Sequence, residues 1–440
     1  ELFGELAVGP VSRRLVGIFL ATTALKKDAG AGIEPGEIRP VERLGVVGAG
    51  FMGAAIAGVA ALRAGVDVRL RDTEWDRVAR GIASATRVLD DARRRKRLDR
   101  YEHYRRSALL SGSPDTAGYR RRDLVIEAVF EDIGVKRQTI ADLEQVVADE
   151  CVVATNTSTI PIGLLQDGAR LPERIVGMHF FSPVERMPLL EVIRGPATGD
   201  RATAVAVRFG RRMGKTVIVV RDAPGFWVNR ILAPYLNEAG WLLDEGVPIE
   251  TIDSTMTRFG FPVGPLALLD EVGLDVAGKA AGVLHDALGA RLAPSPVVGG
   301  LIQAGRLGRK SGRGFYRYVR GKRRGADDSV RALIQPTRRA TRRPAPAEIE
   351  SRLLLAMLNE AARAMSEEIA RSPGDGDIGA VMGFGFPPFL GGPLRHVDDL
   401  GATAVVARLE DLAGRLGPRF APADVLVEMA RTRRTFYDWR

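Results

Sequence analysis

Residues 44–53, LGVVGAGFMG, decide the fold of this chain. An apolar run that suits a buried strand leads directly into Gly48, Gly50 and Gly53. Glycines at this spacing let the backbone turn tightly, approach a pyrophosphate and pack a helix closely on the strand. The same pattern alone would be weak in a chain with 50 glycines, but here a helical stretch, residues 54–63, follows it. The segment therefore predicts a dinucleotide-binding βαβ unit.

A carboxylate ends the second strand-like run of this unit. Asp72 follows residues 66–71, where such folds place the acid that binds the adenosine ribose. A carboxylate there accepts hydrogen bonds from the ribose hydroxyls and repels a 2′-phosphate, so the sequence favours NAD over NADP. Arg69 and Arg71 are close by and could weaken that discrimination.

Composition limits the class of protein. A chain of 440 residues predicts two to four domains, and 45% hydrophobic with 27% charged residues is typical of soluble globular proteins. No apolar run is long enough to span a bilayer, and the acidic start does not suit a signal peptide. The single cysteine, Cys151, excludes an internal disulfide and suits a cytoplasmic location. Because the sequence begins with Glu1 rather than Met, it is compatible with a fragment of a longer protein.

The formal net charge of +10 comes mostly from clustered arginines. Solvated surface is the simpler interpretation of these clusters. A second interpretation is a field that attracts a polyanionic substrate such as a coenzyme A ester. Nucleic-acid binding is disfavoured because no recognition module accompanies the charge. The clusters are residues 93–97, 120–122, 320–324 and 338–343.

Strand and helix patterns alternate up to Pro224, which predicts an α/β Rossmann-type domain with a mainly parallel sheet and helices on both faces. After Pro224 no strand is expected, and all-α C-terminal domains follow. Residues 316–346 are rich in Arg, Gly and Pro and are interpreted as a linker. The expected strands are residues 44–47, 67–70, 124–128, 152–155, 175–178, 190–193 and 216–220. The expected domains are a helical linker (1–40), the NAD-binding domain (41–222), a first helical copy (223–318), a basic linker (319–347) and a second helical copy (348–440).

The two helical copies are inferred from motifs that recur in the same order, which predicts a duplicated helical domain. One matching tetrapeptide could arise by chance, but four matches in order could not easily do so. The matches are LNEA at 236–239 and 358–361, FGFP at 259–262 and 384–387, GPL at 264–266 and 392–394, and an acidic pair at 270–271 and 398–399.

Oxidation of an alcohol by NAD needs a base for the hydroxyl proton. Of the four histidines, His103 and His285 are expected on helix surfaces, and His396 lies in the second helical copy. His179 instead ends an apolar strand, where open α/β sheets bind their ligands. Glu191 lies inside another apolar strand and needs a partner to offset its desolvation. That partner is either His179, which would fix the imidazole tautomer, or an arginine.

Further motifs carry a family resemblance. They are GAGFMG (48–53), NTST (156–159), MHFFSPV (178–184), LEVI (190–193), PGF with VNR (224–230) and residues 308–316. Together they resemble L-3-hydroxyacyl-CoA dehydrogenase, and more specifically the dehydrogenase portion of bacterial multifunctional fatty-acid oxidation proteins. The resemblance runs over nearly the whole chain. It implies NAD-dependent oxidation of (S)-3-hydroxyacyl-CoA to 3-oxoacyl-CoA in β-oxidation.

The resemblance also implies roles for individual residues. His179 would be the general base and Glu191 its orienting partner. Ser158 would bind the substrate near its 3-hydroxyl, and Asn229 would align substrate and base. Ser182 stands where the family usually has Asn, so altered cofactor contacts are expected. The cofactor set is Gly48, Gly50, Phe51, Met52, Gly53, Asp72, Glu131, Lys136, Ser158 and Ser182, with Glu131 and Lys136 near the nicotinamide-side ribose and no metal.

Similar multifunctional proteins carry an enoyl-CoA hydratase domain before the segment that matches residues 1–30. That domain is absent from this sequence, so the chain is expected to oxidise hydroxyacyl-CoA without hydrating enoyl-CoA. Ser351 occupies the place of Asn229 in the second helical copy, which is therefore expected to be structural, forming a pseudo-dimer with the first. A thiolase subunit is a candidate partner. The alternatives are a non-catalytic NAD-binding scaffold and a dehydrogenase of another hydroxy acid.

Overall fold

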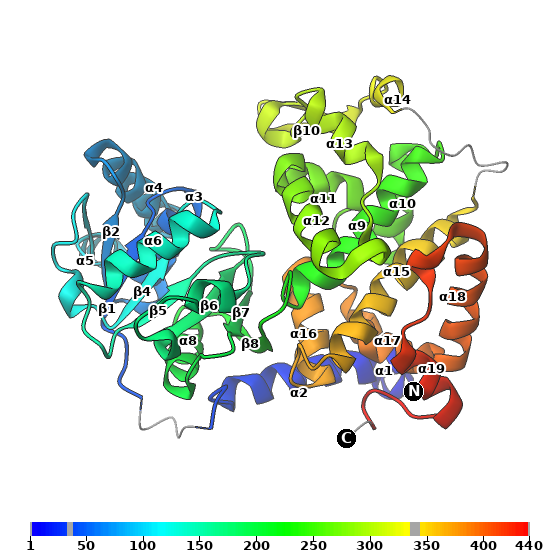
Figure 1. Ribbon diagram of the computed structural model, residues 1–440, viewed down its shortest axis with the longest axis horizontal. Coiled ribbons are helices and arrows are strands. Elements are labelled where there is room, and N and C mark those ends of the chain that lie inside the picture. Colours follow the sequence, from blue (N-terminus) through cyan, green and yellow to red (C-terminus); the bar gives the residue numbers. More distant parts are fainter. Residues whose placement is uncertain (1, 33–37, 335–343, 439–440) are drawn as a thin grey trace. The chain divides into compact units, whose positions relative to one another are not determined.

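The computed structural model describes residues 2–32, 38–334 and 344–438, and it contains two compact units (Figure 1). The α/β unit comprises Phe19–Phe226 with the short segment Ile369–Arg371. The helical unit comprises Glu1–Ile18, Trp227–Glu368 and Ser372–Arg440. In the described ranges no helix is long and apolar enough to cross a membrane.

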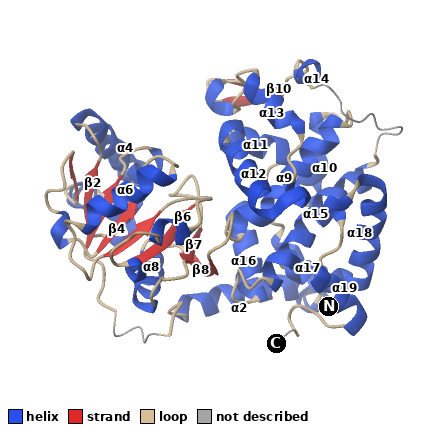
Figure 2. Ribbon diagram, viewed as in Figure 1, coloured by secondary structure: helices blue, strands red, loops and turns tan. Residues whose placement is uncertain are grey.

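The α/β unit is built on one eight-stranded sheet, with strand order β3-β2-β1-β4-β5-β6-β7-β8 (strands red in Figure 2). Every neighbouring pair is parallel except β6 and β7, which run antiparallel. The predicted mainly parallel sheet is therefore confirmed. The strands are β1 Arg43–Val47, β2 Asp67–Arg71, β3 Leu110–Ser113, β4 Leu124–Glu127, β5 Val152–Thr155, β6 Ile175–Phe180, β7 Leu189–Arg194 and β8 Thr216–Arg221.

One face of this sheet forms the main hydrophobic core with helices α3 and α8. Alternate residues of each strand point to that face, among them Val46, Ile126 and Met178. Helices α6 and α7 contact β4 and β6. Helix α1, Leu2–Val8, and the first part of α2, Pro10–Lys27, belong to the helical unit. The helices of the α/β unit are α3 Phe51–Val59, α4 Trp75–Arg94, α5 Arg100–Ser107, α6 Ile133–Glu144, α7 Ile162–Gln166 and α8 Asp200–Arg212, with a π-helical turn, Ala60–Ala64, after α3.

Helices dominate the second unit, as predicted, but the expectation of no strands after Pro224 is wrong. Strands β9 and β10 pair as an antiparallel hairpin inside the stretch interpreted as a linker, and α14 follows them. The bounds are α9 Val228–Asp244, α10 Ile249–Phe259, α11 Pro265–Val272, α12 Leu274–Leu288, α13 Pro296–Gln303, β9 Tyr316–Val319, β10 Lys322–Ala326, α14 Val330–Leu333, α15 Pro346–Ser366, α16 Pro373–Phe384, α17 Pro393–Leu400, α18 Ala402–Leu416 and α19 Asp424–Thr432.

The repeated LNEA motif makes the same contacts in both helical copies. The amide of Asn237, on α9, donates to the carbonyl of Ala293 at 2.7 Å and accepts from the backbone N–H of Ser295 at 2.7 Å. The amide of Asn359, on α15, bridges a second loop in the same way. It donates to the carbonyl of Ala421 at 2.8 Å and accepts from the backbone N–H of Ala423 at 2.8 Å. Equivalent side chains thus hold equivalent loops, which supports the duplication.

Buried ion pairs run reciprocally between the two copies. Arg230 of the first copy donates to Glu360 at 2.9 Å and also pairs with Glu367 in the second. Arg352 of the second copy donates to Glu238 of the first copy at 2.7 Å, and it also pairs with Glu245, the residue that follows α9. Both arginines are almost fully buried. Helices α9 and α15 therefore pack together through matched contacts in both directions.

Candidate functional site

The glycine turn between β1 and α3 has the geometry that a dinucleotide requires. Gly48 has φ 97°, and a Cβ there would lie 2.4 Å from the carbonyl oxygen of Ala128. A Cβ at Gly53 would lie 1.8 Å from the Gly48 carbonyl oxygen. A Cβ at Gly50 would meet no atom within 4 Å. Two glycines are thus required by the packing of the chain itself, whereas Gly50 keeps the α3 N-terminus open to a phosphate group.

Asp72 reaches back from β2 to this turn. Its carboxylate accepts a hydrogen bond from the backbone N–H of Ala49 at 2.8 Å and lies half-buried at the edge of the glycine loop. The neighbouring guanidinium groups are engaged elsewhere, because Arg69 donates to the carbonyl of Ala117 at 2.6 Å and Arg71 to that of Pro114 at 3.2 Å. With both guanidinium groups engaged in this way, the placement of Asp72 fits the preference for NAD over NADP that the sequence predicts.

A second polar group lies beyond β4 and β5. Glu131 accepts hydrogen bonds from the hydroxyl of Thr157 at 2.6 Å and from the backbone N–H of Ser158 at 2.9 Å. Its other oxygen lies 3.3 Å from the ammonium of Lys136. Burial raises the pKa of Glu131, but Lys136 and these hydrogen bonds outweigh that effect and bring the pKa below its ordinary value. The structure therefore brings together three residues that the sequence assigned to the cofactor and substrate site.

His179 and Glu191 face each other across the antiparallel strands β6 and β7. The strand register pairs the two residues directly, and His179 Nδ1 lies 2.7 Å from Glu191 Oε2. The glutamate is fully buried, and the histidine is 5% exposed. Because a carboxylate can only accept, Nδ1 donates its proton to Glu191, and Nε2 is left as the proton acceptor. Of the two partners considered for Glu191, the structure selects the histidine over an arginine.

Aromatic rings surround the imidazole. The Phe181 ring lies 4.4 Å from the His179 ring, centroid to centroid, and the buried Phe226 ring lies 5.8 Å away. Phe226 has φ 53°, a backbone conformation that bulky residues rarely adopt. The end of β6 is tied to the neighbouring loop because the backbone N–H of Phe180 donates to Asn156 Oδ1 at 3.0 Å. These contacts hold the imidazole in one orientation.

The other predicted site residues lie on several different elements. Phe51 begins α3 and is 73% exposed, while Met52 beside it packs partly against the core. Ser182 is exposed in the loop after β6. Asn229 is the second residue of α9 and belongs to the helical unit, unlike His179, Glu191 and Ser158.

The remaining histidines do not resemble His179. His103, expected to be solvated, instead has a side chain only 17% exposed, and its Nε2 lies 2.8 Å from Asp90. His285 lies near the end of α12, with its Nδ1 3.2 Å from the Gly289 carbonyl oxygen. Burial lowers the pKa of His396 to about 4, so that ring stays neutral at physiological pH.

Sequence reasoning missed one buried acid near the site. Glu127, the last residue of β4, is fully buried and accepts from Lys136 at 2.8 Å. The available signal was a charged residue within an apolar run, the same signal that identified Glu191. Among the described residues no group of three or more His, Cys, Asp or Glu side chains is arranged to hold a metal ion.

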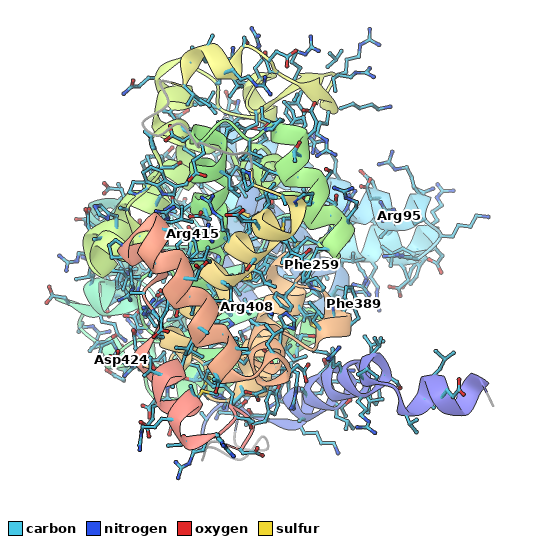
Figure 3. The ribbon with its side chains drawn as sticks, turned by 90° about the vertical axis from the view of Figure 1, so that its right-hand side faces the viewer. Arg95, Phe259, Phe389, Arg408, Arg415 and Asp424 are labelled. Atoms are coloured by element: carbon cyan, nitrogen blue, oxygen red, sulfur yellow. The ribbon has the colours of Figure 1, made fainter. Side chains whose placement is uncertain are left out.

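A dense basic cluster lies at the C-terminal end of α4. The five residues 93–97 are all exposed, and Arg95 is labelled in Figure 3. The backbone N–H of Arg97 donates to the Ala92 carbonyl at 2.9 Å, and Lys96 has φ 55°. These features end the helix in a left-handed turn, and the exposed positive charges lie on this turn.

Two family models match this chain. Residues 43–223 match the model described as 3-hydroxyacyl-CoA dehydrogenase, NAD binding domain, and residues 225–318 match the model described as 3-hydroxyacyl-CoA dehydrogenase, C-terminal domain. The glycine turn, Asp72 and the His179–Glu191 pair all lie within the first of these ranges. The chain belongs to the 3-hydroxyacyl-CoA dehydrogenase family. It is an NAD-dependent dehydrogenase.

Solved structures support this assignment. The chain is 28% identical to 3-hydroxybutyryl-CoA dehydrogenase from Escherichia coli, with 90% of this chain and 99% of that chain covered and a TM-score of 0.79. It is 26% identical to the dehydrogenase part of multifunctional enzyme 1 from C. elegans, covering 94% and 96%, with a TM-score of 0.65. It is 36% identical to (S)-3-hydroxybutyryl-CoA dehydrogenase from Ralstonia eutropha, covering 64% and 100%, with a TM-score of 0.61.

Proposed function

We propose that this chain oxidises (S)-3-hydroxyacyl-CoA to 3-oxoacyl-CoA with NAD, as a step of fatty-acid β-oxidation, and that His179 is the general base. The observation that carries the proposal is the buried 2.7 Å contact between His179 Nδ1 and Glu191. With Nδ1 committed to the carboxylate, Nε2 accepts the 3-hydroxyl proton of the substrate. Glu191 then stabilises the imidazolium that forms, in a site where little water competes for either group.

The cofactor residues fit NAD. The turn at Gly48, Gly50 and Gly53 would hold the pyrophosphate, and Asp72 would bind the adenosine ribose. Phe51 and Met52 extend this turn, and Ser182 would contact the cofactor from the loop after β6. Glu131 and Lys136 would lie at the nicotinamide-side ribose. NAD, when bound, supplies the hydride acceptor for the oxidation.

Two further residues are proposed to contact the substrate. Ser158 would donate a hydrogen bond near the 3-hydroxyl, and Asn229 would align the substrate with His179. The exposed cations at 93–97 would attract the phosphates of the coenzyme A moiety. A binding site with these features favours an acyl-CoA ester over a free hydroxy acid.

The second helical copy is proposed to be structural. The reciprocal ion pairs between α9 and α15 support a pseudo-dimer, in which each helical copy covers the other within one chain. Ser351 at the position of Asn229 supports the loss of a substrate role in that copy. A cytoplasmic location and a thiolase partner are further proposals that follow from the family assignment.

Substrate class is the point to test first. NADH oxidation should be rapid with acetoacetyl-CoA and much slower with free acetoacetate at the same concentration, both followed by absorbance near neutral pH. A preference for the free acid would favour a dehydrogenase of another hydroxy acid. NADH binding without turnover of either compound would favour the non-catalytic scaffold.

A further inference from the structure

A buried ion pair, Glu127 with Lys136, adjoins the proposed cofactor residue Glu131. The Glu127 carboxylate receives the Lys136 ammonium at 2.8 Å and 3.0 Å, one contact to each oxygen. The side chains of Glu127 and Lys136 are 0% and 1% exposed. Charges buried this deeply are tolerated only with good geometry and further hydrogen bonds. The position of Lys136 therefore depends on Glu127.

Glu127 also fixes the backbone around the site. It accepts from the backbone N–H of Val129 at 2.7 Å and from the hydroxyl of Thr155 at 2.6 Å. The peptide that precedes Val129 contributes the Ala128 carbonyl, which packs against Gly48. One carboxylate thus links β4, β5, α6 and the loop that borders the glycine turn.

The other side of Lys136 faces Glu131. The two groups are 3.3 Å apart, further than the 2.8 Å contact between Lys136 and Glu127. Glu131 in turn accepts from the Ser158 backbone N–H at 2.9 Å. A continuous chain of charged and polar contacts therefore runs from the buried acid, through Lys136 and Glu131, to the proposed substrate residue Ser158.

We propose that Glu127 is a positioning residue of the cofactor site, which acts by anchoring Lys136. The anchored ammonium favours the charged form of Glu131 without drawing it into a tight ion pair. Glu131 then keeps its contacts with Ser158 and presents a carboxylate to a ribose hydroxyl. This inference rests on the proposed function, because that proposal places Glu131 and Lys136 at the nicotinamide-side ribose.

The main test is the affinity of the full chain for NADH, measured by fluorescence titration. In Glu127→Gln the anchor loses its charge, so Lys136 should move toward Glu131 and disturb the ribose site. We expect the Kd for NADH to rise about tenfold, roughly the value of one charge-assisted hydrogen bond. Because this readout needs no turnover, it remains informative even if acetoacetyl-CoA is not a substrate.

A matched control is Glu144, another buried acid of the α/β unit. It lies 3.4 Å from the Arg174 guanidinium and accepts the backbone N–H groups of Arg170 and Leu171, away from the proposed cofactor residues. Glu144→Gln should leave the Kd for NADH unchanged. Equal weakening by Glu144→Gln and Glu127→Gln would mean that general destabilisation is responsible, and it would overturn the proposal.

A double-mutant cycle separates positioning from a structural effect. If Glu127 acts through Lys136, then adding Glu127→Gln to Lys136→Met should change the Kd for NADH no further. Additive effects would contradict the proposal, as would an unchanged Kd in Glu127→Gln alone. Should Glu127→Gln fail to fold, Thr155→Val keeps the charge and removes one hydrogen bond to Glu127. The proposal predicts a rise of about two- to threefold in Kd for Thr155→Val, and no change would overturn it.

Discussion

The first and second helical copies share the contacts that hold their fold. In the first, Asp253 accepts two backbone N–H groups at the start of α11 and the hydroxyl of Tyr316. In the second, Asp377 accepts two N–H groups at the start of α17 and the hydroxyl of Tyr437. The asparagine bridges and the reciprocal arginines are likewise present in both copies. Each shared contact satisfies a buried polar group that would otherwise be costly to leave unpaired.

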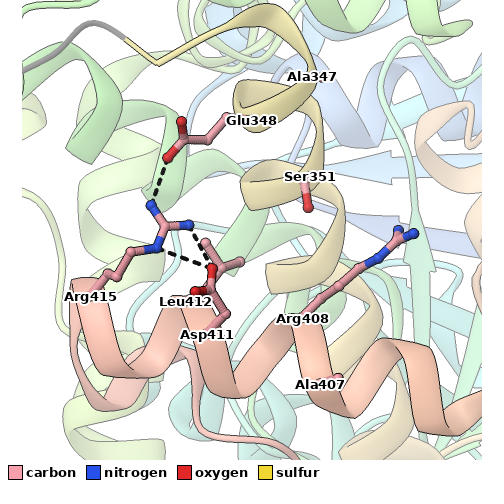
Figure 4. Close-up of a pocket in the computed structure, with 8 residues that line it drawn as sticks. All are labelled: Ala347, Glu348, Ser351, Ala407, Arg408, Asp411, Leu412 and Arg415. Atoms are coloured by element: carbon pink, nitrogen blue, oxygen red, sulfur yellow. Dashed lines mark hydrogen bonds and ion pairs between the residues drawn. The ribbon is translucent and has the colours of Figure 1, made fainter.

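The copies differ where the first is proposed to touch the substrate. Asn229 is the second residue of α9. Ser351 takes the equivalent position on α15 and lines a pocket of about 520 Å³ between α15 and α18 (Figure 4). In that pocket Arg415 is held by Glu348 at 2.8 Å and by Asp411 at 2.9 Å. The contacts needed for folding are therefore kept in both copies, while the proposed substrate contact is present in only one.

The largest effect is expected from the reciprocal arginines. Arg352→Met removes the more deeply buried of the two cations that hold Glu238, leaving Arg419. Arg230→Met removes the nearest cation of Glu360, leaving Arg291 and Arg363 at longer distances. Each should lower the free energy of unfolding by about 3–5 kcal/mol, measured by urea denaturation. Arg352→Lys keeps the charge and should cost less. A near wild-type stability for only one of the two Met variants would break the equivalence of the copies.

Stability should depend on pH through the two buried aspartates, Asp377 and Asp253. Burial raises the pKa of Asp377 from 3.8 to about 7, against the opposing hydrogen bonds from Leu394, Tyr437 and Arg395, and it also raises that of Asp253. Because the unfolded chain ionises first, the stability that Asp377 contributes is full below about pH 4 and is lost as the pH rises to about 7. The total is on the order of 4 kcal/mol.

Urea unfolding at pH 5 and pH 8 tests this expectation. From pH 5 to pH 8, the free energy of unfolding should fall more for the wild type than for Asp377→Asn, which has no carboxyl group to ionise. Asp253→Asn is the equivalent variant of the first copy and is measured in the same way. If the wild type and Asp377→Asn differed in free energy of unfolding by the same amount at both pH values, the raised pKa of Asp377 would be contradicted.

Activity should respond to one copy alone. Asn229→Ala should lower kcat about 10- to 100-fold, the usual effect of misplacing a reacting group slightly. Ser351→Ala should leave kcat unchanged, because that residue has no proposed contact with the substrate. Steady-state NADH oxidation with acetoacetyl-CoA measures both variants. Comparable losses in the two would show that the second copy takes part in the reaction.

The smallest effect is expected from the bridging asparagines. Asn359→Ala and Asn237→Ala each remove the side-chain bridge between a loop carbonyl and a loop N–H, at a cost of about 1–2 kcal/mol. The loss should be larger for Asn359, which is buried, than for Asn237, which is only half-buried. Thermal denaturation would show this order, and the reverse order would argue that burial does not set the cost.

Much of this architecture could be predicted because the local signals are strong. The glycine turn and the apolar strands around it specify the nucleotide-binding fold, and His179 stands out as a titratable residue near a strand end. Its pairing with Glu191 depends on β6 and β7 being antiparallel, a long-range feature without a local signal. Sequence reasoning therefore left the choice between a histidine and an arginine partner open.

The missed strands have weak sequence patterns for physical reasons. Strand β3, with the sequence LSGS, lies at the edge of the sheet and contains little apolar surface. Strand β10 contains Lys-Arg-Arg-Gly-Ala, and all but its last residue are exposed, so its charge resembles that of a linker. The hairpin forms through pairing with β9, which composition alone does not reveal.

The buried His179–Glu191 pair is proposed to carry out the proton transfer of the reaction. Its most direct test is NADH oxidation by His179→Ala with acetoacetyl-CoA, alongside a fluorescence titration of NADH binding. Turnover should fall by roughly two to four orders of magnitude, the usual contribution of a positioned base, while the Kd for NADH stays near that of wild type. Turnover equal to wild type would remove His179 from the mechanism.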